Sequence, residues 1–118
     1  MKKKNIIRLR REFEEIRNKG RMYQSPIFGL LVLRRPRQTW LRNNESKFAF
    51  IISKKISKKA VVRNKIRRLL AESVRVNLKN IKKGYLVLFL VKKEIVGMKF
   101  GEVEREVKRM FERVGVVK

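Results

Sequence analysis

Cationic side chains are concentrated in one stretch, SKKISKKAVVRNKIRRLL, which runs from Ser53 to Leu70 and contains no acid. A guanidinium group binds phosphate through paired hydrogen bonds and stacks on bases, whereas an ammonium group acts as a point charge. The stretch therefore predicts contacts with a polyanion, in which the arginines make the more specific contacts. Its lysines and arginines are Lys54, Lys55, Lys58, Lys59, Arg63, Lys65, Arg67 and Arg68.

The charge of the whole chain supports this interpretation. The 118 residues include 34 Lys and Arg against 10 Asp and Glu, which gives a formal net charge of +24. So much charge of one sign opposes the compact state unless a polyanion relieves it. We expect nucleic acid as the partner, and no membrane, because no predicted helix combines its cations with an exposed aromatic face.

Side chains suited to protein-borne catalysis are scarce. The chain has no histidine and no cysteine, which removes the commonest general base, thiolate metal sites and disulfides. The glutamates include two groups that resemble metal clusters, Glu12, Glu14 and Glu15, and Glu102, Glu104 and Glu106. We interpret both groups as helix-surface residues near helix N-termini or in i,i+4 pairs with cations. The sequence thus predicts neither a catalytic residue nor a metal site in the protein.

The length and hydropathy of the chain indicate one domain, spanning residues 1–118, with a basic arm over about residues 1–9. The start, MKKKNIIRLRR, lacks the apolar run of a signal peptide. The longest apolar run, Tyr85 to Val91, is too short to span a bilayer. We therefore expect a cytoplasmic protein.

Hydrophobic periodicity predicts an α+β fold in which helices pack on a small sheet. Helices are expected over residues 10–19, 58–77 and 99–114, and strands over 26–33, 47–53 and 84–91. The order is α-β-β-α-β-α, and residues 34–46 read as a loop. Gly20 follows the first helix, where a C-terminal cap is expected.

The second of these helices carries the basic stretch. Its apolar stripe consists of Ile66, Leu69, Leu70, Ser73 and Val74. Arg63 and Arg67 lie one turn apart, as do Lys65 and Arg68. The cations therefore flank the apolar stripe, and one edge of the domain is expected to be strongly positive.

Alternation along the first two strands separates a bulky face from a small one. The bulky sets are Phe28, Leu30 and Val32, and Phe48, Phe50 and Ile52. Gly29, Ala49 and Ser53 lie on the opposite, smaller faces. If the two strands are neighbours, their small faces together form a shallow groove.

The run ISKKISKKAVVRNKIRRLLAE resembles the RNR motif of the bacterial ribonuclease P protein subunit, most specifically over Ala60 to Arg68. The start RLRREF, the first helix ending in KG and the strand GYLVLFLVKK are also similar to that family. The resemblance covers nearly the whole chain.

The resemblance implies the order α-β-β-(β)-α-β-α, with an additional strand that we expect within residues 34–46. It also implies a left-handed βαβ crossover, although general rules favour the right-handed form. The family's protein binds a catalytic RNA, and together they remove the 5′ leader of precursor tRNA. The RNA carries the chemistry, with Mg²⁺ held mainly by the RNA and the substrate, and no small-molecule substrate is involved.

Two sets of site residues follow from the resemblance. The set that would contact the RNA subunit is Arg63, Asn64, Lys65, Arg67, Arg68, Lys54, Lys55, Lys58 and Lys59. The set that would line a cleft for the leader, between the first helix and the sheet, is Phe13, Arg17, Gly29, Leu31, Ala49, Ile51 and Ser53. Arg17 and Leu31 stand where the family often has aromatic residues, and Ala71 stands where the motif has an arginine.

Two other functions remain open from the sequence. A ribosomal or general structured-RNA-binding protein would share the charge and need no leader cleft. A ribosome-dependent endoribonuclease toxin would use Arg, Lys and Tyr side chains, with Tyr23 and Tyr85 as candidates. Trp40, in the predicted loop, would either anchor that loop on the sheet or stack on RNA, and we favour the anchor.

Overall fold

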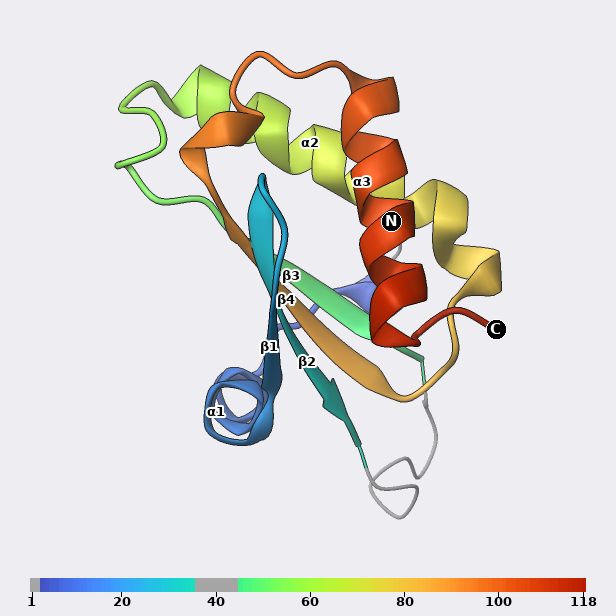
Figure 1. The fold of residues 1–118 in the computed structure, drawn as a ribbon. Coiled ribbons are helices and arrows are strands. Elements are labelled where there is room, and N and C mark those ends of the chain that lie inside the picture. Colours follow the sequence, from blue (N-terminus) through green and yellow to red (C-terminus); the bar gives the residue numbers. More distant parts are fainter. Residues whose placement is uncertain (1–2, 36–44) are drawn as a thin grey trace.

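A four-stranded sheet forms the middle layer of the molecule, and helices cover both of its faces. The computed structural model describes residues 3–35 and 45–118. Helix α1 (Arg10–Lys19) lies on one face of the sheet, and α2 (Ala60–Asn77) and α3 (Phe100–Val114) lie on the other (Figure 1). The α+β prediction is confirmed, and the three helices begin and end within two residues of their predicted limits.

The strands are β1 (Arg21–Gln24), β2 (Phe28–Arg34), β3 (Lys47–Ile51) and β4 (Tyr85–Val91), in the spatial order β1-β2-β4-β3. The central strand β4 pairs antiparallel with β2 and parallel with β3. Helix α2 makes the crossover between the parallel strands β3 and β4. The left-handedness of this crossover stays a prediction.

The third strand before α2 is β1, which follows α1 directly. The prediction of an additional strand before α2 is thus met by β1. Its expected place within residues 34–46 falls mostly on residues 36–44, with Trp40 among them, which lie outside the described residues. The sequence of β1, RMYQ, has no hydrophobic pattern that predicts a strand. This agrees with the structure, in which β1 is largely exposed. It forms because a short connection, with Ser25 N–H donating to Phe28 O at 2.9 Å, folds it back on β2.

The end of α1 depends on Gly20. This residue is the C-terminal cap as expected, but its φ of −68° is not left-handed. A Cβ at this position would lie 2.3 Å from the carbonyl oxygen of Ile16, so only glycine fits.

The main core lies between the sheet and the pair α2 and α3. The ring centroid of Phe89 is 5.0 Å from that of Phe28 and 5.1 Å from that of Phe50. From α2, the apolar stripe buries Ile66, Leu70 and Val74 together with Ser73. The bulky strand faces are thus confirmed as the core side, and this packing fixes which side of α2 faces solvent.

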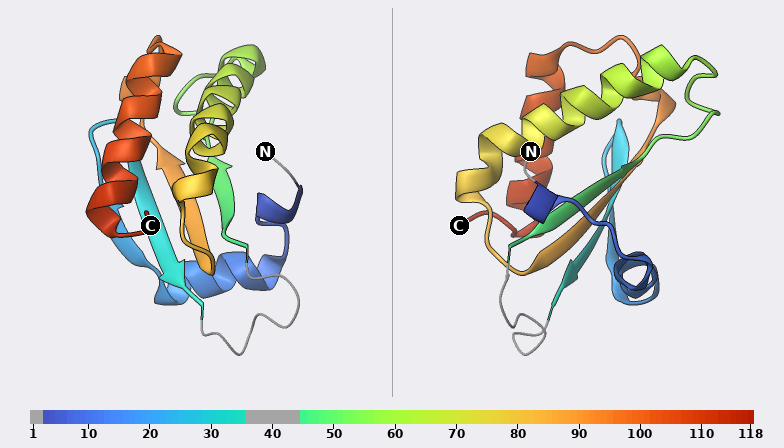
Figure 2. Two further views of the ribbon diagram at one scale, coloured as in Figure 1. Left: turned by 90° about the vertical axis from the view of Figure 1, so that its right-hand side faces the viewer. Right: turned by 180° about the vertical axis from the view of Figure 1, so that it is seen from behind.

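The residues before α1 lie along the outer edge of β3. Ile6 bridges Phe48 in parallel, and Ile7 N–H donates to Phe48 O at 2.9 Å. Asn5 Nδ2 donates to Ser46 O at 3.0 Å. The short 3-10 helix η1 (Lys3–Asn5) therefore lies on the opposite side of α2 from α3 (Figure 2). Two further 3-10 helices are η3 (Leu78–Asn80) and η4 (Lys93–Ile95).

Candidate nucleic-acid interface

The basic stretch covers the start of α2 and the segment before it (Figure 1). Arg63 is half-buried and the other eight residues predicted to contact the RNA subunit are exposed. None of these cations forms an ion pair with an acid in residues 3–35 or 45–118. Their charge is therefore available to an external anion.

Two contacts within the stretch orient its arginines. Arg63 Nη1 donates to the carbonyl oxygen of Ser57 at 2.7 Å, which ties α2 to the preceding turn. Arg67 Nη1 donates to Asn64 Oδ1 at 3.1 Å. Asn64 therefore holds the Arg67 guanidinium, which reduces the side-chain entropy that a phosphate contact would cost.

The N-terminus of α2 is electrostatically unusual. Its first turn contains no acid, and its N-cap residue, Lys59, makes no side-chain capping bond. The helix dipole places partial positive charge at the same end, where cations are unfavourable and anions are stabilised. The start of α2 thus lacks a negative partner within the described part of the chain.

A hollow of about 360 Å³ lies on one flank of α2, toward β3 and the N-terminal segment. It brings Phe13 and Ala49, predicted to line the leader cleft, together with Arg67, predicted to contact the RNA subunit. Its walls are mostly apolar, with a guanidinium at the rim. Its lining residues are Ile6, Ile7, Phe13, Phe48, Ala49, Phe50, Arg67 and Ala71.

The sheet face beneath α1 is continuous with this hollow. Leu31 lies opposite Leu88 in β4, and Leu88 lies opposite Ala49 in β3. In the next row, Leu90 separates Gly29 from Ile51. Gly29, Leu31, Ala49 and Ile51 therefore share one face, but their strands are not neighbours.

Strand β4 lies between them and adds three leucines, Leu86, Leu88 and Leu90, that the sequence analysis did not assign to this face. Phe13, Leu31 and Ala49 pack against a cluster that includes Leu88, and Leu90 packs there too. The alternation in YLVLFLV would have placed these leucines on one face, but only the strand order puts that face under α1.

The remaining predicted cleft residues lie apart from this cluster. Gly29 is buried, and a Cβ there would lie 3.3 Å from Gln24 Oε1, so the side chain of Gln24 covers it. Ser53 follows the end of β3 and is exposed, as is Ile51. Arg17 is exposed on the last turn of α1. The structure thus brings together Phe13, Leu31 and Ala49 from this set, next to Arg67.

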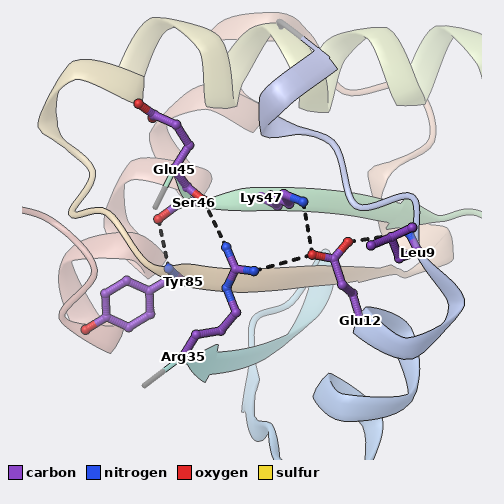
Figure 3. A network of polar contacts seen from close by, with 7 residues as sticks. All are labelled: Leu9, Glu12, Arg35, Glu45, Ser46, Lys47 and Tyr85. Atoms are coloured by element: carbon purple, nitrogen blue, oxygen red, sulfur yellow. Dashed lines mark hydrogen bonds and ion pairs between the residues drawn. The ribbon is translucent and has the colours of Figure 1, made fainter. Parts of the chain in front are cut away.

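Helix α1 is held in place by a buried ionic network (Figure 3). Glu12 Oε2 accepts a hydrogen bond from Lys47 Nζ at 3.0 Å and another from Arg35 Nη1 at 3.4 Å. Its other oxygen, Oε1, lies 3.4 Å from the donating N–H of Leu9. The side chain of Glu12 is only 5% exposed, so the prediction of a surface position was wrong for this residue. The network links α1, next to Phe13, to β3 and to the residue that follows β2.

The network continues to the start of β3 (Figure 3). Arg35 Nη2 donates to the carbonyl oxygen of Glu45 at 3.4 Å. Ser46 Oγ donates to Lys82 O at 2.5 Å and accepts from Tyr85 N–H at 3.0 Å. These bonds fix the two ends of the segment between β2 and β3 against β4.

Other glutamates behave as the sequence predicted. Glu14 pairs with Arg10 at 3.2 Å on the surface, and Glu102 accepts from Lys99 N–H at 3.1 Å at the start of α3. In residues 3–35 and 45–118, no three His, Cys, Asp or Glu side chains are grouped so as to hold a metal ion. None of the helices described is both long and apolar enough to cross a membrane.

Comparison with known proteins decides the family. The chain matches the family model described as Ribonuclease P over residues 1–115. It belongs to the ribonuclease P protein family. The resemblance inferred from the RNR motif is thereby confirmed, and the chain is a protein component of ribonuclease P.

Relatives and solved structures agree along the full length. The ribonuclease P protein component of Clostridium acetobutylicum is 29% identical over 98% of this chain and 92% of its own. That of a Synechococcus species is 31% identical over 94% of this chain and 82% of its own. The ribonuclease P protein of Thermotoga maritima superimposes with a TM-score of 0.77 at 25% identity, covering 92% of this chain and 96% of its own. The Staphylococcus aureus protein shares the fold, with a TM-score of 0.81 at 18% identity, over 97% of this chain and 98% of its own.

Proposed function

We propose that this ribonuclease P protein binds the catalytic RNA subunit through α2 and the 5′ leader of precursor tRNA through the face beside α1. The observation that carries the proposal is the continuity of the two surfaces. The unpaired cations of α2 run into an apolar hollow that contains Phe13. An aromatic ring beside a guanidinium is the arrangement that single-stranded nucleic acid uses for base stacking and phosphate contact.

The catalytic step belongs to the RNA in this proposal. Mg²⁺ is held mainly by the RNA subunit and the substrate, and the protein contributes binding and position. The absence of histidine and cysteine from the sequence supports this division, because the chain lacks the commonest proton-transfer side chains. The protein acts as one RNA-binding domain over residues 1–118, with its basic arm at the N-terminus, and its place of action is the cytoplasm.

The roles of the two surfaces differ physically. Lysines before α2 attract RNA and displace counterions, whereas Arg63, Arg67 and Arg68 make directed phosphate contacts. On the leader side, Phe13 offers a ring for stacking, and Leu31 and Ala49 offer apolar contact. We assign phosphate pairing to Arg17, which is exposed on α1, and further leader contacts to Ile51 and Ser53, which are exposed at and after the end of β3.

The test is cleavage of a precursor tRNA by a bacterial ribonuclease P RNA, with and without this protein, at a low Mg²⁺ concentration. The protein is expected to restore cleavage at the correct 5′ position. Binding to the RNA without restored cleavage would favour the alternative of a general RNA-binding protein. Cleavage by the protein alone would favour the toxin alternative.

The leader role has its own test. Phe13→Ala should weaken binding of a precursor with a leader by roughly 5- to 150-fold, the effect of losing one stacked base. Affinity for mature tRNA, measured with the same reconstituted enzyme, should stay unchanged. Equal losses with both substrates would contradict the leader role. Tyr23 and Tyr85, the candidates of the toxin alternative, pack against the main core, which gives their rings a structural explanation.

A further inference from the structure

Phe100 is an exposed aromatic residue outside both predicted surfaces. Its side chain and backbone together are 38% exposed, whereas the other aromatic residues of the described chain are buried or half-buried. The sequence pattern placed Phe100 on the apolar side of the last helix. In the structure the buried side of α3 consists of Val103, Val107, Met110 and Phe111, and Phe100 at the first position lies outside that core.

Phe100 lines a second hollow, of about 490 Å³, between α2 and the start of α3. The apolar part of its wall comes from Phe100 and Leu69, with the aliphatic stems of the long cationic side chains beside them. The cations at its rim are Lys65 and Arg68. Its lining residues are Lys65, Arg68, Leu69, Ala71, Glu72 and Phe100.

The charge of this hollow is positive despite the presence of Glu72. Glu72 is engaged by Arg75, whose Nη2 and Nε lie 2.6 Å and 2.9 Å from the two carboxylate oxygens. The hydrogen bond from Arg75 lowers the pKa of Glu72, so this acid stays ionised and paired. Lys65 and Arg68 form no ion pair with any acid that the structure describes. Two cations therefore border an apolar wall without a counterion.

The two hollows lie on different flanks of α2. Arg67 lines the hollow that contains Phe13, and Lys65 and Arg68 line the hollow that contains Phe100. Figure 2 shows why: α2 lies between α3 on one side and the N-terminal segment on the other. A ligand in the second hollow thus lies on the other flank of α2 from the leader side, and Ala71 lines both hollows.

We propose that this second hollow binds an unpaired nucleotide of the catalytic RNA, with its base stacked on Phe100 and its phosphate held by Arg68 and Lys65. The inference rests on the proposed function, because it takes the RNA bound by α2 as the ligand. The chemistry favours this occupant: an aromatic face is complementary to a base, and the adjoining cations form no ion pair within residues 3–35 and 45–118. A purely apolar partner would leave both cations facing it without compensation.

The test measures binding of the RNA subunit by the full-length protein and its variants at one fixed salt concentration. Phe100→Ala should weaken binding by roughly 5- to 150-fold, and Phe100→Leu should also weaken it, because leucine keeps apolar contact but removes the ring. Phe100→Tyr keeps the ring and should bind like the wild type. Val96→Ala is the matched control, since Val96 is 46% exposed in the segment before α3 but does not line the hollow. Thermal unfolding of each variant verifies folding.

Two further readouts separate stacking from charge. Phe100→Ala should leave the slope of log K against log salt unchanged, whereas Arg68→Ala should reduce its magnitude by about 0.7, the value for one phosphate of a single strand. Chemical probing of the RNA should find an unpaired base that the wild type and Phe100→Tyr protect and that Phe100→Ala does not.

Several results would overturn the inference. If Phe100→Ala binds the RNA like the wild type, the hollow takes no nucleotide. If Phe100→Leu binds normally, the residue supplies apolar contact without stacking. If Phe100→Ala lowers self-association in sedimentation and not RNA binding, the hollow is an interface between protein copies. If the wild type does not bind the RNA subunit at all, the proposed function fails, and this inference fails with it.

Discussion

At the scale of single residues, Glu12 shows how this chain fixes its binding surface. A buried carboxylate loses hydration, and that loss is repaid only by close cations and hydrogen bonds. Glu12 has Lys47 and Arg35 as partners, whose side chains are only 19% and 11% exposed. Because Phe13 follows Glu12 directly, the same network sets the position of the ring that we assign to the leader.

We expect Glu12→Gln to lower the free energy of unfolding by about 3 kcal/mol, because two buried cations lose their counterion. Urea unfolding followed by circular dichroism measures this change. Glu14→Gln is the control: Glu14 lies two residues further along α1 but is paired on the surface, with 57% of its side chain exposed. It should cost less than about 0.5 kcal/mol. Similar values for the two variants would show that the network does not hold α1.

At the scale of elements, α2 contributes residues to a hollow on each of its two flanks. Its buried stripe fixes its rotation against the sheet, so each exposed cation has a defined direction. Arg67 faces the hollow of Phe13, and Arg68, the next residue, faces the hollow of Phe100. Under the proposed function, adjacent arginines of the motif would therefore contact different parts of the RNA assembly.

This arrangement predicts different phenotypes for two adjacent substitutions. Arg67→Ala should weaken precursor binding more when a leader is present, because its guanidinium lies beside the leader surface. Arg68→Ala should weaken binding of the RNA subunit and show no dependence on the leader. The measurement is the dissociation constant of the reconstituted enzyme for precursors with and without a leader, alongside that of each protein for the RNA subunit. Identical leader dependence for the two variants would contradict the two-flank arrangement.

The elements also mark the limit of inference from the sequence. The helices were predictable because each buries a periodic stripe, as with Ile66, Leu70 and Val74 in α2. Strand β1 was not, because its residues are mostly exposed and only its pairing with β2 defines it. The strand order could not be predicted either, because β4 pairs with both β2 and β3 across long separations in sequence. The leucines of β4 under α1, and the burial of Glu12, depend on that order and could not be assigned beforehand.

At the scale of the whole molecule, a net charge of +24 on 118 residues creates strong repulsion in the free protein. The repulsion is greatest where the lysines of residues 54–59 meet the positive end of the α2 dipole, with no acid in the first turn. An RNA bound there removes the repulsion and displaces counterions. Binding of the RNA subunit should therefore be steeply salt-dependent, with roughly a 10³-fold loss between 50 and 200 mM salt if about six phosphates are contacted. A titration of affinity against salt that gives a flat line would contradict this role for the charge.

The same repulsion predicts that simple anions stabilise the free protein. Sulfate should raise the thermal unfolding midpoint more than chloride at equal ionic strength, because a divalent anion that binds the folded state shifts unfolding by mass action. The increment should diminish when Lys54, Lys55, Lys58 and Lys59 are replaced together by glutamine, since these cations supply the site. Replacement of four exposed lysines outside α2, Lys19, Lys93, Lys108 and Lys118, by glutamine removes the same net charge and should keep the sulfate increment. Both proteins are followed by circular dichroism. If the two multiple variants lose equal amounts, the stabilisation comes from overall charge, and the start of α2 is not its source.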